Sequence, residues 1–314
     1  MSPKVKGYLL GIVAAASYGM NPLFTLPLYK AGMSPDSVLF FRYLFAIPIL
    51  GGMLLWRGRN FKVKRREMPP FIMLGLLFAL SSLTLFQSYN YMEAGIASTL
   101  LFVYPILVAV IMATVFNEKI SKQTVLCILM AVSGIALLYR SDDGTTLSLM
   151  GTLLVFASAI SYAIYIVGIN KTSLRSVATL KVTFYVIVLG TLLFACRLLI
   201  IKDFKVPTMS EWHLWSNLLC LAIFPTALSL LCTTSAIQYI GSTPTAILGA
   251  LEPVTAVIIG VCVFGETITS RIVIGLLLII ISVTFVVSDG NITLHLTRFR
   301  KMFPKISRRI KFKK

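Results

Sequence analysis

Ten stretches of about 20 mostly apolar residues occupy most of this 314-residue chain and limit the folds it can adopt. About 20 apolar residues form a helix long enough to cross a hydrocarbon core roughly 30 Å thick. Charged residues make up 13% of the chain, against about 25% in a soluble domain. The sequence therefore predicts an all-α polytopic membrane protein with ten transmembrane helices and no separate soluble domain. The expected spans are residues 7–29, 37–56, 69–91, 96–116, 122–139, 148–169, 179–201, 214–238, 243–264 and 271–288.

An internal repeat relates the fourth expected span to the ninth. Pro105 and Pro253 each open an apolar run that ends in an acidic turn, at Glu118 and Glu266, and both pairs are 148 positions apart. An odd number of spans separates the two copies, so the two halves should have opposite orientations in the membrane. The sequence therefore predicts two inverted five-helix repeats with a site between them. The predicted units are residues 7–139, residues 148–288 and a basic tail, 289–314.

The distribution of Lys and Arg predicts the orientation of the chain. If the N-terminus is cytoplasmic, most of these residues fall in cytoplasmic segments, as the positive-inside rule requires. Both termini are then cytoplasmic, and the net charge of +18 reflects topology and not nucleic-acid binding. The basic tail is expected to lie on anionic lipid headgroups, with a solvated retention tail as the alternative. We expect the chain in a plasma membrane, namely a bacterial inner membrane.

Short motifs in a fixed order over the ten spans resemble a known family. On these motifs the chain resembles the drug/metabolite transporter superfamily, in particular its EamA-type branch, over residues 7–288. The resemblance implies two copies of a five-helix domain and secondary transport, commonly export, of small metabolites, amino acids or drugs. Cys127 departs from the pattern, and we expect this to affect helix packing only. The matching motifs are Ala16–Gly19 followed by Asn21, Phe41–Tyr43, Pro105 with Glu118, Pro253 with Glu266, Ser161–Tyr165, and Gly134.

Two charged residues lie well inside expected spans, where a charge is costly and often functional. Glu252, beside Pro253, is a candidate to bind a substrate ammonium group, a proton or a sodium ion, and the alternative is a structural carboxylate. Arg42 is a candidate to pair with an anionic substrate group or with Glu252, and the alternative is a cation that snorkels to the headgroups. The repeat partner of Glu252 is the neutral Tyr104, so a cavity lined by both would suit an amphoteric ligand.

Polar and aromatic side chains inside the first and sixth spans are further candidates to line a substrate cavity. Tyr18 and Asn21 share one helix face, Pro22 should kink that helix, and Tyr162 and Tyr165 have the same spacing. Tyrosines stack on apolar ligands and also donate hydrogen bonds, although interfacial tyrosines are the common alternative.

Other patterns favour a transporter over an enzyme or a channel. We expect no cofactor or metal, because the histidines are peripheral and the cysteines lack metal-ligand spacing. Scattered acidic residues do not suit a membrane-embedded enzyme, and two charges inside the spans do not suit a pore. Glu118 and Glu266 are expected to hold the turns after their helices by accepting backbone N–H bonds. The favoured interpretation is a secondary transporter of a small-molecule solute that works by alternating access, with substrate, direction, coupling and oligomeric state open.

Overall fold

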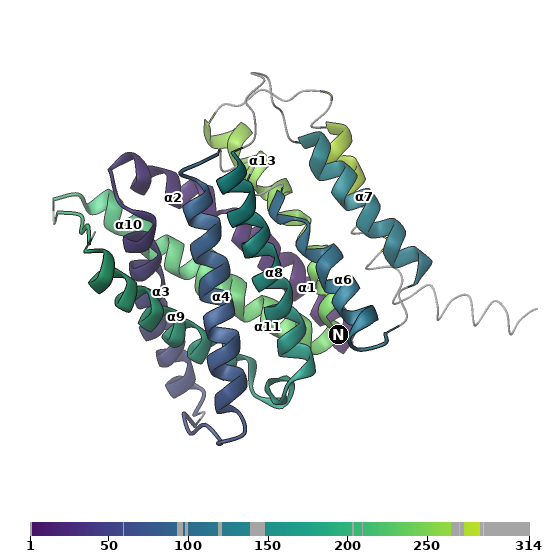
Figure 1. Cartoon of the computed structure of the whole chain (residues 1–314), viewed down its shortest axis with the longest axis horizontal. Helices are drawn as coiled ribbons and strands as arrows, with labels where there is room; N and C mark the ends of the chain where they lie inside the picture. The colour runs from purple at the N-terminus through teal and green to yellow at the C-terminus, as the bar shows by residue number, and fades with distance from the viewer. Residues whose placement is uncertain are drawn as a thin grey trace, which may run out of the picture.

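The computed structural model contains only helices and connecting segments in the part of the chain that it describes, in agreement with the all-α prediction. The helices pack side by side as one bundle (Figure 1). The described residues are 2–58, 60–92, 97, 100–118, 121–138, 148–202, 204–208, 210–264, 270, 273–282 and 285. The predicted lipid contact of the tail 289–314 and the predicted role of Glu266 therefore lie outside the described residues.

The first half of the chain begins its helices at serine caps and prolines. The side chains of Ser2 and Ser34 accept backbone N–H groups one turn on, and a proline follows each of them at a position that needs no N–H donor. Pro22 lies in the first turn of a new helix, because α1 ends at Gly19 and α2 begins at Asn21. The helices are α1 (Pro3–Gly19), α2 (Asn21–Lys30), α3 (Pro35–Trp56), α4 (Met68–Ser88), α6 (Tyr104–Thr114) and α7 (Lys122–Leu138).

The second half is more broken than the sequence pattern predicts. The single helix expected over 214–238 has a π-helical middle segment, which contains Pro225. The helix expected over 243–264 is interrupted at Gly249 and Ala250. The elements are α8 (Leu149–Lys171), the 3₁₀ helix η1 (Ser173–Ser176), α9 (Thr179–Ile201), α10 (Trp212–Leu221), the π-helix η2 (Ala222–Leu228), α11 (Ser229–Ile240), α12 (Ser242–Leu248) and α13 (Leu251–Phe264).

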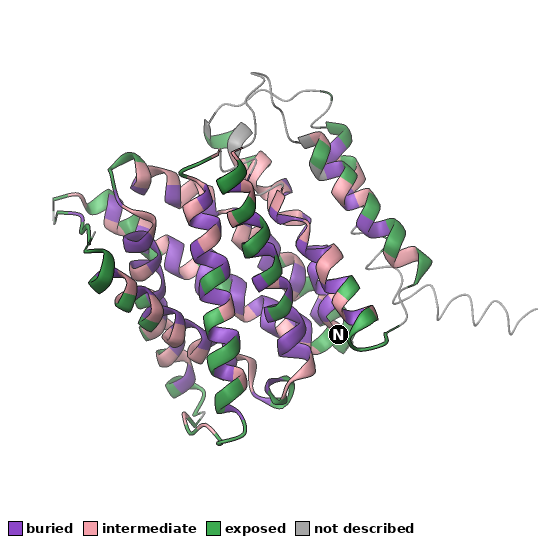
Figure 2. Ribbon diagram, viewed as in Figure 1, coloured by how far each residue is buried: buried purple, intermediate pink, exposed green. Residues whose placement is uncertain are grey.

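Among the described residues, seven helical stretches are long and apolar enough to cross a membrane. Three shorter apolar helices, Tyr104–Thr114, Lys122–Gly134 and Val273–Ser282, fall within the other three expected spans. That these three helices also cross the membrane, which would make ten spans, remains a prediction. Apolar side chains such as Leu80, Leu129 and Leu192 are exposed, and exposed residues line the outward faces of the helices (Figure 2). Lipid tails cover such faces in a multi-pass membrane protein.

Close contacts between small residues set the antiparallel packing of the helices. A Cβ atom on Gly7 would lie 2.6 Å from the side chain of Ile240, and the hydroxyl of Ser229 donates to the carbonyl of Ala14 at 2.9 Å. These contacts make α1 and α11 antiparallel. Small residues let helix backbones approach closely in membranes. The corresponding contacts that make α4 and α8 antiparallel are Ser81–Ser158 and Leu74–Gly168.

Candidate functional site

A cavity lies where α1, α2, α4, α6 and α13 meet. It holds about 450 Å³ of empty space, part of it open to solvent. Four of the predicted substrate-binding residues line it, namely Tyr18, Asn21, Tyr104 and Glu252, and so do the predicted helix-breaking prolines Pro22 and Pro253. Phe102 and Tyr89 also line this cavity, and the sequence patterns did not single them out. A carboxylate, an amide and several aromatic rings around one space suit a small organic ligand.

A second, smaller cavity lies on the other side of Tyr104 and Glu252. It holds about 240 Å³ of empty space, and Tyr162, Thr233 and Gly249 are among its lining residues. Tyr104 and Glu252 line both cavities. They therefore form the partition between the two spaces.

Glu252 lies in the first turn of α13, directly after the break between α12 and α13. Its backbone N–H donates to the carbonyl of Gly249 at 2.9 Å, so the break leaves the chain in a tight turn. Its carboxylate makes no hydrogen bond or ion pair with any described residue. Gly19 of α1 packs on the carbonyl of Glu252, where a Cβ atom would lie 2.4 Å away. The carboxylate is thus held at the cavity wall and is available to a ligand.

Tyr104 owes its position to a glycine on the neighbouring helix segment. A Cβ atom at Gly249 would lie 1.6 Å from the Tyr104 hydroxyl, so no larger residue fits there. The rings of Tyr104 and Tyr162 are 4.9 Å apart in an edge arrangement that favours aromatic pairs. Tyr165, predicted to line the cavity, is fully buried and lies outside both cavity linings, with its ring 5.0 Å from Phe78.

Arg42 is fully buried behind the first cavity and does not line it. Its guanidinium donates to the hydroxyl of Thr226 and, at 3.2 Å, to the carbonyl of Pro225. It also lies 5.8 Å from the ring of Tyr18 and 5.4 Å from the ring of Phe86, within cation–π range. Arg42 therefore neither snorkels to the headgroups nor forms an ion pair with a described carboxylate such as Glu252.

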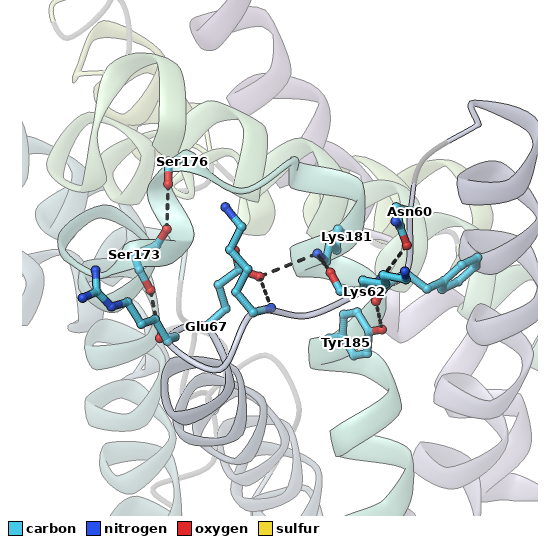
Figure 3. Close-up of polar contacts among 10 residues, drawn as sticks. Asn60, Lys62, Glu67, Ser173, Ser176, Lys181 and Tyr185 are labelled. Carbon is cyan, nitrogen blue, oxygen red and sulfur yellow. Dashed lines mark hydrogen bonds and ion pairs between the residues drawn. The ribbon is translucent and has the colours of Figure 1, made fainter.

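Polar contacts at one end of the bundle join the segment before α4 to α9. The carboxylate of Glu67 lies 3.6 Å from the ammonium of Lys181, which also donates to the carbonyl of Lys62. Tyr185 donates to the carbonyl of Phe61 at 2.5 Å (Figure 3). These contacts link the two halves of the chain near an aqueous boundary.

The other helix-end charges also pair across the halves. Glu118 forms an ion pair of 2.6 Å with Lys171, at the end of α8, a partner that the sequence did not predict. Asp36 forms an ion pair of 2.7 Å with Arg197 and accepts from Gln87 at 3.0 Å. In the described residues, no group of three or more His, Cys, Asp or Glu could hold a metal ion.

A multi-pass helical protein with polar cavities at the centre of its bundle has the architecture of a membrane transporter. Comparison with known proteins identifies the family. The model of the EamA-like transporter family matches residues 5–140 and again residues 149–288, so the chain belongs to the EamA-like transporter family. It is a membrane protein whose partners are a small-molecule solute and the lipid bilayer.

Similar proteins carry transporter names. The chain is 26% identical over 296 residues to the uncharacterized transporter YvbV of Bacillus subtilis, covering 90% of this chain and 92% of that protein. It is 25% identical to the uncharacterized transporter YyaM of the same organism, covering 83% of this chain and 87% of that protein. A protein of known crystal structure has the same fold, with a TM-score of 0.76 at 17% identity, covering 89% of this chain and 96% of that one. The names of the relatives thus point to transport and not to an enzyme.

Proposed function

We propose that the chain is a secondary transporter that moves a small solute by alternating access between two inverted halves, residues 7–139 and 148–288. The observation that carries the proposal is the pair of cavities that share Tyr104 and Glu252 as their partition. A solute held at this partition can be reached from one cavity or the other as the halves rock. Export of a metabolite, amino acid or drug is the expected direction, as the family resemblance implies.

Matched contacts between the halves support the inverted arrangement. Gly7 of α1 packs on Tyr239 and Ile240 at the end of α11. Gly151, 144 positions after Gly7, packs on residues 91 and 92, each 148 positions before its counterpart. A contact between one half and the other is therefore repeated with the roles of the halves exchanged. Exchange of this kind is what a two-fold relation between two similar units produces.

The last helices of each half support the same relation. A Cβ atom on Gly134 would lie 2.7 Å from the carbonyl of Gly275, and Ser282 donates to the carbonyl of Cys127 at 2.6 Å. Cys127 and Gly275 are 148 positions apart, and so are Gly134 and Ser282. Gly134 contacts Gly275, and the counterparts of these two residues, Ser282 and Cys127, contact each other. An isologous interface has this reciprocal pattern.

Helix directions support inversion over a parallel repeat. α1 is antiparallel to α11, as described above. α8 runs alongside α11 and α12 in the same direction, because Tyr162 shares a cavity with Thr233 and Ser242 donates to the carbonyl of Ile166 at 3.0 Å. α1 and α8, the first helices of the two halves, are therefore antiparallel to each other.

The two cavities are themselves related by the repeat. Advancing Tyr18 by 144 positions gives Tyr162, and moving Glu252 back by 148 positions gives Tyr104, so each cavity contains the counterparts of the other. Leu85 lines the larger cavity, and its counterpart 148 positions later, Thr233, lines the smaller one. We infer that the larger cavity faces one side of the membrane and the smaller cavity is its counterpart for the other side.

The side of the larger cavity follows from charge. Lys62 and Lys181 lie at the end of the bundle shown in Figure 3, and the positive-inside rule assigns this end to the cytoplasm. The larger cavity extends toward Tyr89, at the opposite end of α4. We propose that it faces away from the cytoplasm in a bacterial inner membrane, with both termini inside.

Glu252 is the proposed binding group for a solute ammonium or for a proton that drives transport. A carboxylate at the partition is the charged group that both cavities reach, and it makes no bond within the described residues. Binding of either partner would therefore change its charge at the point where access switches.

The test begins with a thermal-shift screen of the purified full-length protein against amino acids, nucleosides, sugars and lipophilic cations, because a ligand of the folded state raises the melting temperature. Solutes that bind are then loaded into proteoliposomes and their efflux is measured. We expect Glu252→Gln to slow efflux by roughly 10- to 100-fold, the loss of one hydrogen bond to a charged group. Glu211→Gln, at a half-buried carboxylate before α10 that accepts hydrogen bonds from Thr208 and lines neither cavity, is the control and should transport normally. Normal efflux by Glu252→Gln would remove Glu252 from the mechanism.

A further inference from the structure

A row of buried polar atoms beside the larger cavity has no hydrogen-bond partner. The atoms are Oδ1 of Asn21, Oγ1 of Thr25, the hydroxyl of Tyr29 and Nη1 of Arg42. Each of these residues except Tyr29 is at most 5% exposed. Buried polar groups in proteins are almost always paired, so four unpaired groups in one region need an explanation.

The four groups lie on two neighbouring helices, α2 and α3. Asn21, Thr25 and Tyr29 are spaced four residues apart and therefore share one face of α2. The rings of Tyr29 and Phe86 are 6.4 Å apart, and the Arg42 guanidinium is 5.4 Å from the same Phe86 ring. Asn21 lines the larger cavity, so the row leads from the cavity wall into the protein.

The charge of this row is positive and uncompensated. The bonds that Arg42 makes go to neutral oxygens of Thr226 and Pro225, and no carboxylate of the described residues lies within 4.0 Å of it. The carboxylate of Asp36 is already paired with Arg197. Aromatic faces offset only part of the cost of a buried cation. The hydroxyls of Thr25 and Tyr29 can both donate hydrogen bonds.

We propose that Arg42, Thr25 and Tyr29 form an anion subsite next to the larger cavity. A guanidinium N–H and two hydroxyl donors match a carboxylate or a small inorganic anion. The anion is either the carboxylate of the solute or a free ion such as chloride. The inference deepens the proposed function and rests on it for the route by which the anion arrives.

The second half lacks this subsite, which gives the binding region a direction. Advancing Asn21 and Thr25 by 144 positions gives Tyr165 and Ile169, which cannot bind an anion as a pair. With Glu252 at the partition and Arg42 beyond Tyr18, the region has an anionic end and a cationic end. A solute with a cationic and an anionic group fits in one orientation.

The test measures anion binding by thermal shift, without transport. Purified full-length protein in sodium HEPES, whose bulky anion is a sulfonate and not a carboxylate, is titrated with sodium acetate or sodium chloride at constant ionic strength. Arg42→Lys also removes bonds to η2 and does not separate binding from folding, so the test uses the double variant Thr25→Val with Tyr29→Phe. We expect the apparent Kd of the anion to rise about 100-fold in this variant, because two hydroxyl donors to a charged group are lost. Thr191→Val is the matched control, because its buried hydroxyl donates within its own helix, to Ile187 at 2.9 Å.

Each outcome decides between sources or overturns the subsite. A rise in melting temperature with acetate but not chloride assigns the site to the solute carboxylate, and a rise with chloride assigns it to a free inorganic anion. No rise with either salt, or the same rise in the double variant as in the wild type, overturns the proposal. If Glu252→Gln still binds the anion but loses efflux, the anion subsite and the role of Glu252 in transport are both supported. If the wild type binds the anion but transports no solute, only the proposed function is overturned.

Discussion

The third span of the first half and its counterpart in the second half have the same neighbours but different backbones. α4 is one regular helix of 21 residues, whereas its counterpart is built from α10, η2 and α11. Ser81 and Ser229, 148 positions apart, align the two segments. Ser81 contacts Ser158 of α8, and Ser229 makes the matching contact with Ala14 of α1. Pro225 then stands at the position of Leu77 in α4. Pro225 lies in the π-helical segment of the second helix, whereas the matching part of α4 has no proline.

The physical cause is the missing N–H of Pro225. Proline cannot donate to the carbonyl one turn earlier, that of Leu221, and the hydroxyl of Thr226 donates to this carbonyl instead, at 2.8 Å. The π-helical turn leaves the Pro225 carbonyl free to accept from Arg42 of the other half. The comparison teaches that the halves share a packing scheme, while the irregular helix supplies acceptors for a cation that the regular helix could not hold.

The largest expected effect comes from removing that cation. We expect Arg42→Leu to lower the free energy of unfolding by roughly 2–4 kcal/mol, because two buried acceptors lose their charged donor. The measurement is reversible unfolding of the purified protein in mixed micelles. Arg175→Leu, an exposed arginine in η1, is the control and should change stability by less than about 0.5 kcal/mol. A wild-type stability for Arg42→Leu would show that η2 does not depend on the cation.

The next prediction compares two matched glycines. We expect Gly7→Ala to cost about 1–3 kcal/mol, because the new methyl group meets Cβ of Tyr239 at 2.7 Å and the branched side chain of Ile240 at 2.6 Å. Gly151→Ala should cost under about 1 kcal/mol, since the nearest atom is the flexible end of Met92. Unfolding in mixed micelles measures both.

The control for the glycine pair is Gly52→Ala, where a new Cβ atom would meet nothing within 4 Å. Alanine is the better helix former, so this change should leave stability unchanged or raise it by up to about 1 kcal/mol. Equal losses of unfolding free energy for Gly7→Ala and Gly151→Ala would mean that the side chains facing the two glycines yield to a new methyl group equally. A larger loss at Gly151 would contradict the difference argued here.

Much of the fold could be predicted from the sequence, because the spans follow from hydrophobic length alone. The pairing of Tyr104 with Glu252 was also visible, since a repeat offset relates positions without any knowledge of packing. The π-helix could not be predicted in this way. Pro225 lies inside an apolar run like those of the regular spans, and only the neighbouring Thr226 and Arg42 determine how the backbone responds to it.

The candidate site was predictable for some residues and not where tertiary contacts decide. Tyr162 and Tyr165 have the same sequence signal, but Tyr162 lines a cavity and Tyr165 packs into the core on Phe78. Gly249 was not singled out, because a glycine's importance depends on which side chain lies opposite it, here Tyr104. Helix rotation and partner identity are properties of the whole bundle and leave no mark in a single span.

The smallest effects test whether the matched serines are equivalent. The Ser81 and Ser158 hydroxyls lie 3.0 Å apart, and at the matched position Ser229 donates to the Ala14 carbonyl, because alanine has no hydroxyl to offer. We expect Ser81→Ala and Ser229→Ala each to cost about 0.6 kcal/mol in mixed-micelle unfolding, the typical contribution of an interhelical hydrogen bond in a membrane protein. Ser235→Ala is the control, since that hydroxyl donates within its own helix to Leu231, and it should cost nothing measurable. If one serine cost more than about 1.7 kcal/mol and the other nothing, the two contacts would have different energetic roles and the symmetry of the halves would be one of shape only.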